Sequence, residues 1–363
     1  MKPKYLFVIL FVIIISIPTL FLPFYESSTA SENRAKDKFP EWYTLYTYPV
    51  LFIRKVDAFY KSNFALRNHL YNFYKYLKWD ILGENPFPNE VVVGKDGWLF
   101  PGNKSYHNYD QSLGVVSDIE ERMDTTCSKM LAMKTFCDSL GIDFYLAIGP
   151  DKASVYPEML PIKPLTVGKT KDVVKRKLKG FHVNVIDMSD YILEQKDGQK
   201  LYFYKTDTHW NHLGAYLGTQ RLLDEIRKKY DVGVIDLNDY QVKDTAVFTM
   251  DLSRQIDVPM KESYSVFKKQ KDDYTKTIRS MNYDGWDVPL EETINVKRES
   301  KCVVFRDSYF QNMYDYFCNN VGHAVIGVQR FDRNLILKVR PDFVVLELVE
   351  RRLLDFDPNE FYL

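Results

Sequence analysis

The sequence predicts an α/β protein of three layers, in which a largely parallel sheet lies between two layers of helices, preceded by one membrane-spanning helix. Short continuous apolar runs at residues 144–148, 303–305, 324–328 and 343–346 have the character of strands buried on both faces of a sheet. Helical stretches separate these runs, which is typical of parallel strands joined by crossover helices. An uncharged stretch, residues 5–24, stands near the start of the chain.

The start of the chain, residues 1–24, predicts a membrane anchor. At about 1.5 Å of helical rise per residue, residues 5–24 span roughly 30 Å, the thickness of a bilayer's hydrocarbon core. Lys2 and Lys4 precede this stretch and favour a cytoplasmic N-terminus, which puts the rest of the chain across the membrane. A cleaved signal peptide is the alternative, because residues 28–30 are small enough for a signal peptidase. The apolar stretch is long for a signal peptide, which favours an anchor, and in both cases the remainder is periplasmic or extracellular.

Residues 25–90 predict a linker and a helical stalk. Residues 25–40 are polar, whereas residues 41–82 are aromatic, with apolar side chains recurring three and four positions apart as on one face of a helix. Two prolines, Pro86 and Pro88, then end the pattern.

Residues 91–363 predict the main domain, and its elements follow in order. A hairpin comes first, because Val91–Val93 and Leu99–Phe100 flank a turn that contains two glycines. Helices are expected at 118–140, closed by Gly141, at 169–178, and at 211–230, where Asn211 is placed to cap the first turn. Strands are expected at 144–148, 183–188, 303–305, 324–328 and 343–346. Residues 235–298 are polar, and no element is predicted there.

The composition excludes two classes of protein. The chain has 49 basic and 49 acidic residues among 363, so it lacks the basic excess of a general nucleic-acid binder. A hydrophobic fraction of 45% and a charged fraction of 27% exclude wholesale disorder. The four cysteines lack the spacing of a metal site, so no structural zinc is expected. They either form disulfides in an oxidising compartment (Cys127 with Cys137, or Cys302 with Cys318) or remain buried thiols.

The most informative motif is Asp207-Thr208-His209, which stands in a turn just before a predicted helix. An aspartate two residues from a histidine can bind one imidazole nitrogen and leave the other free to act as a base. The alternative is a helix cap with incidental histidines. Because the chain has only six histidines and two of them fall in this turn, at His209 and His212, we favour the functional interpretation.

A second motif places Ser308 directly after a buried strand and before a helical pattern. The carboxyl edge of an α/β sheet is a common ligand site, and a serine there can act as a nucleophile, with backbone N–H groups to hold an oxyanion. An ordinary Asp or Ser cap at Asp307 or Ser308 is the alternative. The presence of the Asp207-x-His209 unit at the end of another element favours a catalytic serine.

These motifs stand in a series that resembles the alginate O-acetyltransferase group of periplasmic proteins, the AlgJ and AlgX type, which is SGNH-hydrolase-like. The resemblance extends from about residue 41 to the C-terminus, and the Asp-Thr-His-Trp string with the downstream serine is its most specific part. Ordinary SGNH hydrolases carry the serine near the start and the Asp-His motif near the end. The reversed order here is consistent with a permuted version of the same site. The segments that carry the resemblance are 94–100, 150–161, 205–210, 307–309 and 348–353.

The resemblance implies roles for individual residues. Ser308 would be the nucleophile, His209 the general base, and Asp207 the residue that orients the imidazole. A substrate-binding or oxyanion role falls to a second set of residues: Lys152, Arg306, Tyr314 at the position of the group's active-site tyrosine, and either Arg330 or Arg333 as its arginine. Lys152 would line the cleft, with an exposed loop lysine as the alternative. The chain departs from the group at Arg306, which stands where SGNH proteins have the glycine of Gly-Asp-Ser.

The resemblance also implies the reaction and its partners. The expected activity is transfer of acetyl groups to hydroxyls of an exported polysaccharide through an acetyl-serine intermediate, without a metal or organic cofactor. Because acetyl-CoA is not expected outside the cytoplasm, a multi-pass membrane acyltransferase would supply the acetyl group. A glycan acetylesterase with the same triad and a non-catalytic glycan-binding subunit are the alternatives. A net charge of zero means that a uronic-acid polymer such as alginate would need a local basic cleft, so a neutral glycan is equally plausible.

Overall fold

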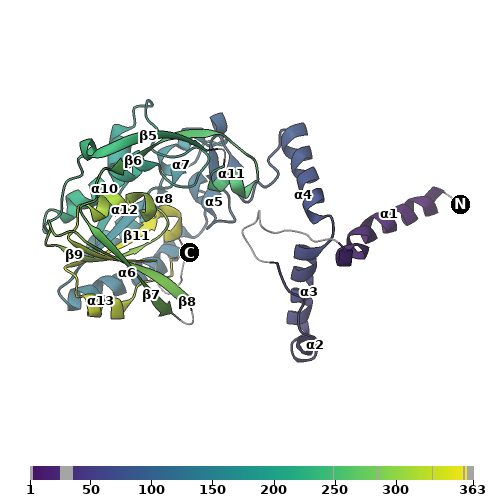
Figure 1. Cartoon of the computed structure of the whole chain (residues 1–363), viewed down its shortest axis with the longest axis horizontal. Coiled ribbons are helices and arrows are strands. Elements are labelled where there is room, and N and C mark those ends of the chain that lie inside the picture. The colour runs from purple at the N-terminus through teal and green to yellow at the C-terminus, as the bar shows by residue number, and fades with distance from the viewer. Residues whose placement is uncertain are drawn as a thin grey trace. The chain divides into compact units, whose positions relative to one another are not determined.

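The computed structural model describes residues 3–24, 36–247, 249–283, 286–328, 330–354 and 356–357. The chain divides into two compact units (Figure 1). The first contains Met1–Pro88 and Arg254–Val258, and the second contains Asn89–Ser253 and Pro259–Leu363. The predicted boundaries at residues 24 and 90 stay predictions.

The first unit is helical. Its helices are α1 (Pro3–Leu20), α2 (Tyr43–Thr47), α3 (Pro49–Asn63), α4 (Arg67–Tyr76) and a single π-turn at Leu77–Ile81. The stalk predicted over 41–82 is therefore helical but interrupted, because Leu66 has a left-handed backbone with φ 63°. Over the described part of the chain, no helix combines the length and the apolar character needed to cross a bilayer. The anchor thus stays a prediction, and the alternative cleavage site at residues 28–30 lies outside the described residues.

The second unit is built on a seven-stranded sheet. The strand order is β4-β3-β11-β9-β10-β8-β7; the first five strands are parallel, and β8 and β7 extend the edge beyond β10 in antiparallel fashion. The strands are β3 (Asp143–Gly149), β4 (Asn184–Asp187), β7 (Thr275–Tyr283), β8 (Trp286–Ile294), β9 (Lys301–Arg306), β10 (His323–Val328) and β11 (Phe343–Val349).

The parallel strands have a permuted order. If counting starts at β9 and continues through β10, β11, β3 and β4, the spatial order becomes 2-1-3-4-5, one of the two common doubly wound arrangements. In such sheets, ligands bind at the carboxyl ends of the two strands where the winding changes direction. That position here is the edge shared by β9 and β11.

Helices cover both faces of the sheet, so the three-layer α/β prediction is confirmed (Figure 1). Successive residues of β9 point to opposite faces: Val303 joins one core cluster and Val304 the other. The first cluster contains residues of α6 (Ile119–Ser139), α8 (Lys169–Leu178) and α13 (Arg333–Val339), and the second contains residues of α10 (His212–Ile226) and α12 (Phe310–Cys318). Shorter helices are α5 (Asn108–Leu113), α7 (Lys152–Val155), α9 (Asp190–Gln195) and α11 (Asp251–Gln255).

Most predicted elements of this unit form where expected. The hairpin is β1 (Val91–Val93) paired with β2 (Leu99–Pro101). The long helix α6 ends before Gly141, whose φ is 71°, a conformation that glycine adopts without strain. Asn211 caps α10 by accepting the N–H of Gly214 at 2.9 Å, although the helix ends at Ile226 rather than near residue 230.

The polar stretch 235–298 is the part that the sequence analysis did not resolve. It contains four strands: β5 (Tyr240–Val247) pairs with β6 (Glu262–Lys269), and β7 pairs with β8. These hairpins expose much of their surface. Tyr240, Phe267 and Leu290 pack against the core, and cross-strand ion pairs add to the backbone pairing. Lys276 with Glu291 at 3.0 Å is one such pair. Without apolar alternation there was no pattern to detect.

The alternatives for the cysteines are also decided. Cys127, Cys137, Cys302 and Cys318 are all free and buried. Burial raises the pKa of Cys127 to about 11 and that of Cys137 to about 12, so both remain thiols at neutral pH.

Candidate active site

Ser308 occupies the turn between β9 and α12, at the carboxyl edge of the sheet. Its neighbour Asp307 is buried, and the Asp307 carboxylate accepts the N–H of Tyr309 at 2.8 Å and the N–H of Val349 at 2.8 Å. Asp307 therefore shapes the turn and ties it to the end of β11. Ser308 itself is exposed between two buried neighbours, which leaves its hydroxyl accessible.

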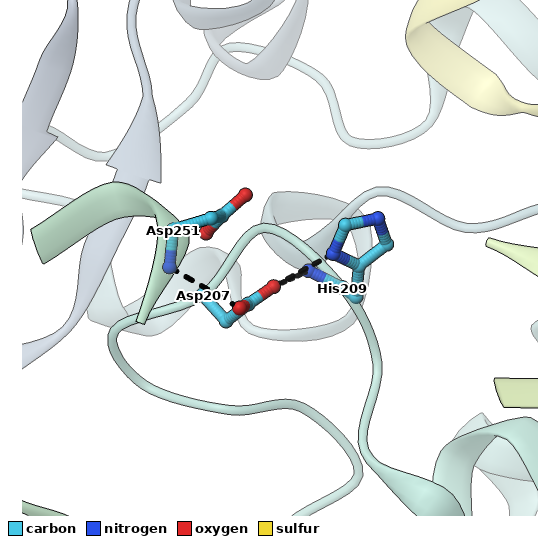
Figure 2. Close-up of side chains that lie close together, drawn as sticks. All are labelled: Asp207, His209 and Asp251. Carbon is cyan, nitrogen blue, oxygen red and sulfur yellow. Dashed lines mark hydrogen bonds and ion pairs between the residues drawn. The ribbon is translucent and has the colours of Figure 1, made fainter. Parts of the chain in front are cut away.

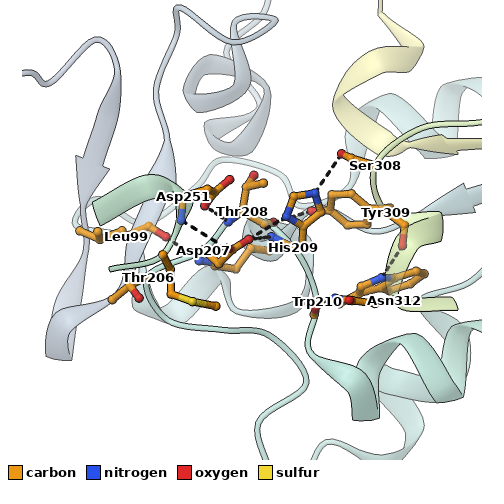
Figure 3. A network of polar contacts seen from close by, with 12 residues as sticks. Leu99, Thr206, Asp207, Thr208, His209, Trp210, Asp251, Ser308, Tyr309 and Asn312 are labelled. Carbon is orange, nitrogen blue, oxygen red and sulfur yellow. Dashed lines mark hydrogen bonds and ion pairs between the residues drawn. The ribbon is translucent and has the colours of Figure 1, made fainter. Parts of the chain in front are cut away.

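His209 lies on the loop before α10 and joins Ser308 to Asp207 (Figure 3). The Nε2 atom of His209 lies 2.9 Å from Ser308 Oγ, and its Nδ1 atom lies 2.7 Å from Asp207 Oδ1. Because the Asp207 carboxylate can only accept when ionised, Nδ1 carries the proton and Nε2 is left to accept the serine hydroxyl. The structure thus brings together all three residues that the sequence analysis selected for nucleophilic chemistry.

Asp207 is held in its ionised form although it is largely buried. Burial alone would raise the pKa of Asp207, but the hydrogen bonds that it accepts from the His209 side chain and from backbone N–H groups outweigh burial and lower that pKa. The backbone contributes as well, since Asp207 Oδ1 accepts the N–H of His209 at 2.9 Å and Oδ2 accepts that of Asp251 at 3.3 Å.

A second carboxylate, Asp251, stands beside this pair (Figure 2). Burial and the nearby Asp207 charge raise the pKa of Asp251 to about 6. Donor atoms of Asp207, His209 and Asp251 all lie within 4.8 Å of one another, so these are the residues that could hold a cation. Because His209 Nδ1 and Asp207 Oδ1 already bind each other, a cation coordinated by Nδ1 would have to displace that hydrogen bond.

Tyr309 connects the serine turn to the histidine loop. Its ring lies beside that of His209, with 5.1 Å between centroids, and its hydroxyl donates to the Thr208 carbonyl at 2.6 Å. Burial raises the pKa of Tyr309, which keeps the hydroxyl protonated as a donor. In return, Trp210 Nε1 donates to the Tyr309 carbonyl at 3.0 Å. Two segments 99 residues apart in the chain are therefore fixed to each other (Figure 3).

The backbone N–H groups on either side of Ser308 already have hydrogen-bond partners, whereas the sequence predicted that they would be free to bind an oxyanion. The N–H of Asp307 donates to Glu347 Oε2 at 3.1 Å, and that of Tyr309 donates to Asp307. Neither is available to an oxyanion without losing a carboxylate partner. The buried Glu347 has a strongly raised pKa because of burial and the Asp307 charge.

Lys152 is placed differently from either expectation. It is 1% exposed, so it is not an exposed loop lysine, and it is too enclosed to line a cleft for a polymer. Its ammonium group donates to the Leu99 carbonyl at 2.7 Å and to the Lys205 carbonyl at 3.1 Å. Its neighbours are therefore backbone atoms of β2 and of the loop that leads to His209.

The other predicted substrate-binding residues lie outside the His209–Ser308 contact. Arg306 is half-buried and donates to the Asp307 carbonyl at 3.4 Å. Tyr314 packs against Phe310, and burial raises its pKa. Arg333 begins α13 and lies over the Phe136 ring of α6 at 5.1 Å, and Arg330 follows the end of β10. Their proposed contacts with substrate stay predictions.

Two functional candidates escaped the sequence analysis, namely Asp251 and Glu262. Both come from the polar stretch 235–298, and both accept backbone N–H groups of the histidine loop. Asp251 Oδ1 accepts the N–H of Thr208 at 2.7 Å, and Glu262 Oε2 accepts the N–H of Thr206 at 2.9 Å. No periodicity or motif marks either residue. Asp251 begins α11 in the connection between β5 and β6, and Glu262 begins β6, so their role depends on where this one hairpin places them in space.

Comparison with known proteins finds one matching family and several relatives. The profile of the family described as "SGNH hydrolase-like domain, acetyltransferase AlgX" matches residues 91–285, a range that includes Asp207 and His209 and ends before Ser308. The chain is similar to a probable alginate O-acetylase AlgJ of Pseudomonas aeruginosa, with 26% identity over 182 residues, 48% of this chain and 42% of that protein. The AlgJ of Pseudomonas fluorescens is 24% identical over 184 residues, 48% of this chain and 43% of that protein. The chain thus spans less than half the length of these relatives.

Solved structures show the same fold. Bacillus cereus PatB1 superposes with a TM-score of 0.55 at 17% identity, covering 75% of this chain and 99% of that one. The O-acetyltransferase domain of Pseudomonas putida AlgJ superposes with a TM-score of 0.51 at 19% identity, covering 74% and 95%.

Proposed function

Because the chain belongs to the family of SGNH hydrolase-like acetyltransferase domains of the AlgX type, we propose that it transfers acetyl groups to hydroxyls of an exported polysaccharide. The observation that carries the proposal is the hydrogen-bond chain from Asp207 through His209 to Ser308, at 2.7 Å and 2.9 Å. The distances are those of a base poised to take a proton from a nucleophile.

In the first half-reaction, Ser308 Oγ attacks the carbonyl carbon of an acetyl ester while its proton moves to His209 Nε2. The tetrahedral intermediate collapses, the bond to the donor oxygen breaks, and His209 returns the proton to that oxygen. The product is acetyl-Ser308. Asp207 stabilises the transient imidazolium and holds the imidazole in the required tautomer.

In the second half-reaction, a sugar hydroxyl attacks the acetyl carbon of acetyl-Ser308. His209 takes the hydroxyl proton and then gives it to the departing Ser308 oxygen, which restores the enzyme and leaves an acetylated sugar. The N–H of Ser308 is the candidate donor to the oxyanion in both steps, because the N–H groups on either side bind carboxylates.

The remaining parts of the proposal concern partners and location. The acetyl donor would be a multi-pass membrane acyltransferase, and the apolar residues 5–24 would anchor this chain beside it, with the catalytic unit in the periplasm or outside the cell. None of these steps calls for a metal or an organic cofactor. The net charge of zero makes a neutral glycan as plausible an acceptor as alginate.

An acetylesterase with the same residues is the second candidate. The exposure of Ser308 favours it, because water could reach the acetyl-enzyme as easily as a sugar hydroxyl. A glycan-binding subunit without catalysis is the third, and the hydrogen-bonded set of three residues speaks against it.

The test is an assay with a chromogenic acetyl ester, with and without neutral and acidic oligosaccharides. We expect acetyl release that disappears in Ser308→Ala, and acetylated oligosaccharide in the presence of a suitable acceptor. Release that depends on Ser308 but never acetylates an acceptor would identify an esterase. Release unchanged in Ser308→Ala would exclude the assigned nucleophile.

A further inference from the structure

The loop from Lys205 to His209 carries two of the three reacting residues, yet it is an irregular segment rather than a helix or strand. Catalytic rates are sensitive to such placement, since a shift of about 1 Å can cost on the order of 10²-fold. The loop therefore needs fixed partners on each side. Two charged side chains from distant parts of the chain supply them at its first peptide groups.

The first partner is Lys152, which donates a hydrogen bond to a backbone carbonyl of the loop. Its ammonium group and the N–H of Leu99 both donate to the Lys205 carbonyl, at 3.1 Å and 2.8 Å. The same ammonium group also binds the Leu99 carbonyl at 2.7 Å, and it lies 5.7 Å and 5.6 Å from the centroids of the Trp98 and Phe100 rings. Lys152 thus joins the loop to β2 from a site closed to solvent.

The second partner is Glu262, the first residue of β6, which accepts hydrogen bonds from backbone N–H groups of the loop. Its Oε1 accepts the N–H of Lys205 at 2.5 Å, and its Oε2 accepts the N–H and the hydroxyl of Thr206 at 2.9 Å and 2.6 Å. A carboxylate that accepts two successive backbone N–H groups fixes the orientation of both peptides. Lys152 and Glu262 therefore hold the peptide group between Lys205 and Thr206 from opposite sides, Lys152 through its carbonyl and Glu262 through its N–H.

Charge balance supports this arrangement. The carboxylates of Asp207, Asp251 and Glu262 all act on Lys152 and favour its charged form, against burial, which lowers the pKa of Lys152 to about 8. Arg351 is the other nearby cation and acts in the opposite direction on Lys152. Lys152 is thus a buried positive charge among the acidic groups around His209.

We propose that Lys152 and Glu262 are positioning residues, which hold the loop so that His209 meets Ser308 and which balance the charge of Asp207. Neither touches the reacting atoms. The proposal rests on the proposed function, since it assigns these residues to the same Ser308 reaction. It accounts for a lysine that burial would otherwise disfavour at this place.

The test compares Lys152→Met and Lys152→Arg in the full chain. Methionine has similar length but neither charge nor donors, so we expect kcat for acetyl transfer to fall on the order of 10²-fold. The KM for the acceptor should stay within about twofold, because Lys152 does not face the substrate. Lys152→Arg keeps the charge and should recover at least about tenfold of the loss.

The matched control is Lys171→Met. Lys171 is also a buried lysine, and its ammonium group binds Ser189 Oγ at 2.7 Å and Asp187 at 3.1 Å. This variant should lower the melting temperature yet keep kcat within about twofold. An equal loss of kcat in Lys171→Met would show a general effect of buried-lysine removal and overturn the proposal.

Glu262→Gln provides an independent variant should Lys152→Met fail to fold. It replaces one of the two carboxylate oxygens by an amide that cannot accept the loop N–H, and a fall in kcat of at least about tenfold is expected. Folded Lys152→Met and Glu262→Gln proteins with the parent kcat would refute the positioning role while Ser308→Ala stays inactive. Activity that survives Ser308→Ala would instead refute the proposed function itself.

Discussion

Two carboxyl groups near the carboxyl edge of the sheet, the half-buried Asp207 and the buried Glu350, have pKa values that move in opposite directions. Asp207 accepts hydrogen bonds from His209 and from a backbone N–H, which lower its pKa in spite of burial. Glu350 follows β11, and burial together with Asp151 raises its pKa to about 7, against the influence of Lys171. The first is therefore suited to holding a charge beside an imidazole, and the second holds a proton near neutral pH.

Asp207→Asn tests the first carboxylate. The asparagine amide can donate to His209 Nδ1, which would favour the tautomer that cannot take a proton from Ser308. We expect kcat/KM to fall by about 10³-fold, while the melting temperature stays within a few degrees of that of the parent. Asp190→Asn, a surface change on α9, is the control and should have the parent rate. A loss under tenfold would mean that Asp207 does not set the tautomer.

Glu350→Gln tests the second carboxylate through the pH dependence of stability. The unfolded chain ionises Glu350 near pH 4.5, whereas the folded chain keeps its proton until about pH 7, so stability is lost as pH rises between these values. Glutamine keeps an acceptor oxygen and cannot ionise. The variant should melt like the parent at pH 4 and higher at pH 8, by about 2–4 °C for each kcal/mol gained.

Glu225→Gln is the matched control for this experiment. Lys228 and Arg221 lower the pKa of Glu225, so the glutamine variant should gain nothing at pH 8. The assignment of Glu350 fails if Glu350→Gln and Glu225→Gln shift the melting temperature alike at pH 8.

At the scale of elements, the sequence predicts those helices and strands that a local pattern of apolar residues or a capping residue marks. The strand ahead of Ser308 is a continuous apolar run, and Asn211 is a recognisable cap, so both motifs could be placed at the ends of their elements. The burial of Lys152 could not be predicted in this way, because it depends on the aromatic rings of Trp98 and Phe100, some fifty residues earlier in the chain. The same holds for Asp251 and Glu262. They lie in the connection and at the second strand of the polar β5–β6 hairpin, where no apolar periodicity predicts an element.

The cap of α10 provides a test at this scale. Asn211 Oδ1 accepts the N–H of Gly214 at 2.9 Å, and the residue stands two positions after His209. Asn211→Ala should cost about 1 kcal/mol of unfolding free energy and also lower kcat, because the start of α10 supports the histidine loop. Denaturant unfolding and the esterase assay measure the two effects.

The matched cap is Asp332, whose Oδ1 accepts the N–H groups of Asn334 and Leu335 at 2.8 Å and 3.0 Å at the start of α13. Asp332→Ala should cost similar stability and keep the parent kcat. If both alanine variants lose kcat in proportion to stability, the helix start at Asn211 has no special link to catalysis.

At the scale of the whole molecule, the order of the strands explains why the catalytic motifs appear reversed in the chain. Counting from β9 restores the 2-1-3-4-5 sheet, with Ser308 at the point where the winding changes direction. The reversed motif order could be read from the sequence, but the edge strands β7 and β8 could not. The net charge of zero remains compatible with a neutral glycan.

The proposed anchor is also a property of the whole chain. We expect the full chain to remain with membranes after alkaline extraction, and a version lacking residues 1–35 to be released. An alkaline phosphatase fused after Leu363 should be active, because that enzyme folds only outside the cytoplasm. An inactive fusion, with release of the full chain from membranes, would contradict the proposed location.

The central claim is that Ser308 carries an acetyl group between donor and acceptor, and the most direct measurement is peptide mass spectrometry across a single turnover. After mixing with an activated acetyl ester, the peptide containing Ser308 should gain the mass of one acetyl group. Addition of an oligosaccharide acceptor should remove that mass from the peptide as the acetylated sugar appears. An acetyl group on another residue, or acetylated sugar formed while the Ser308 peptide never changes mass, would contradict this account.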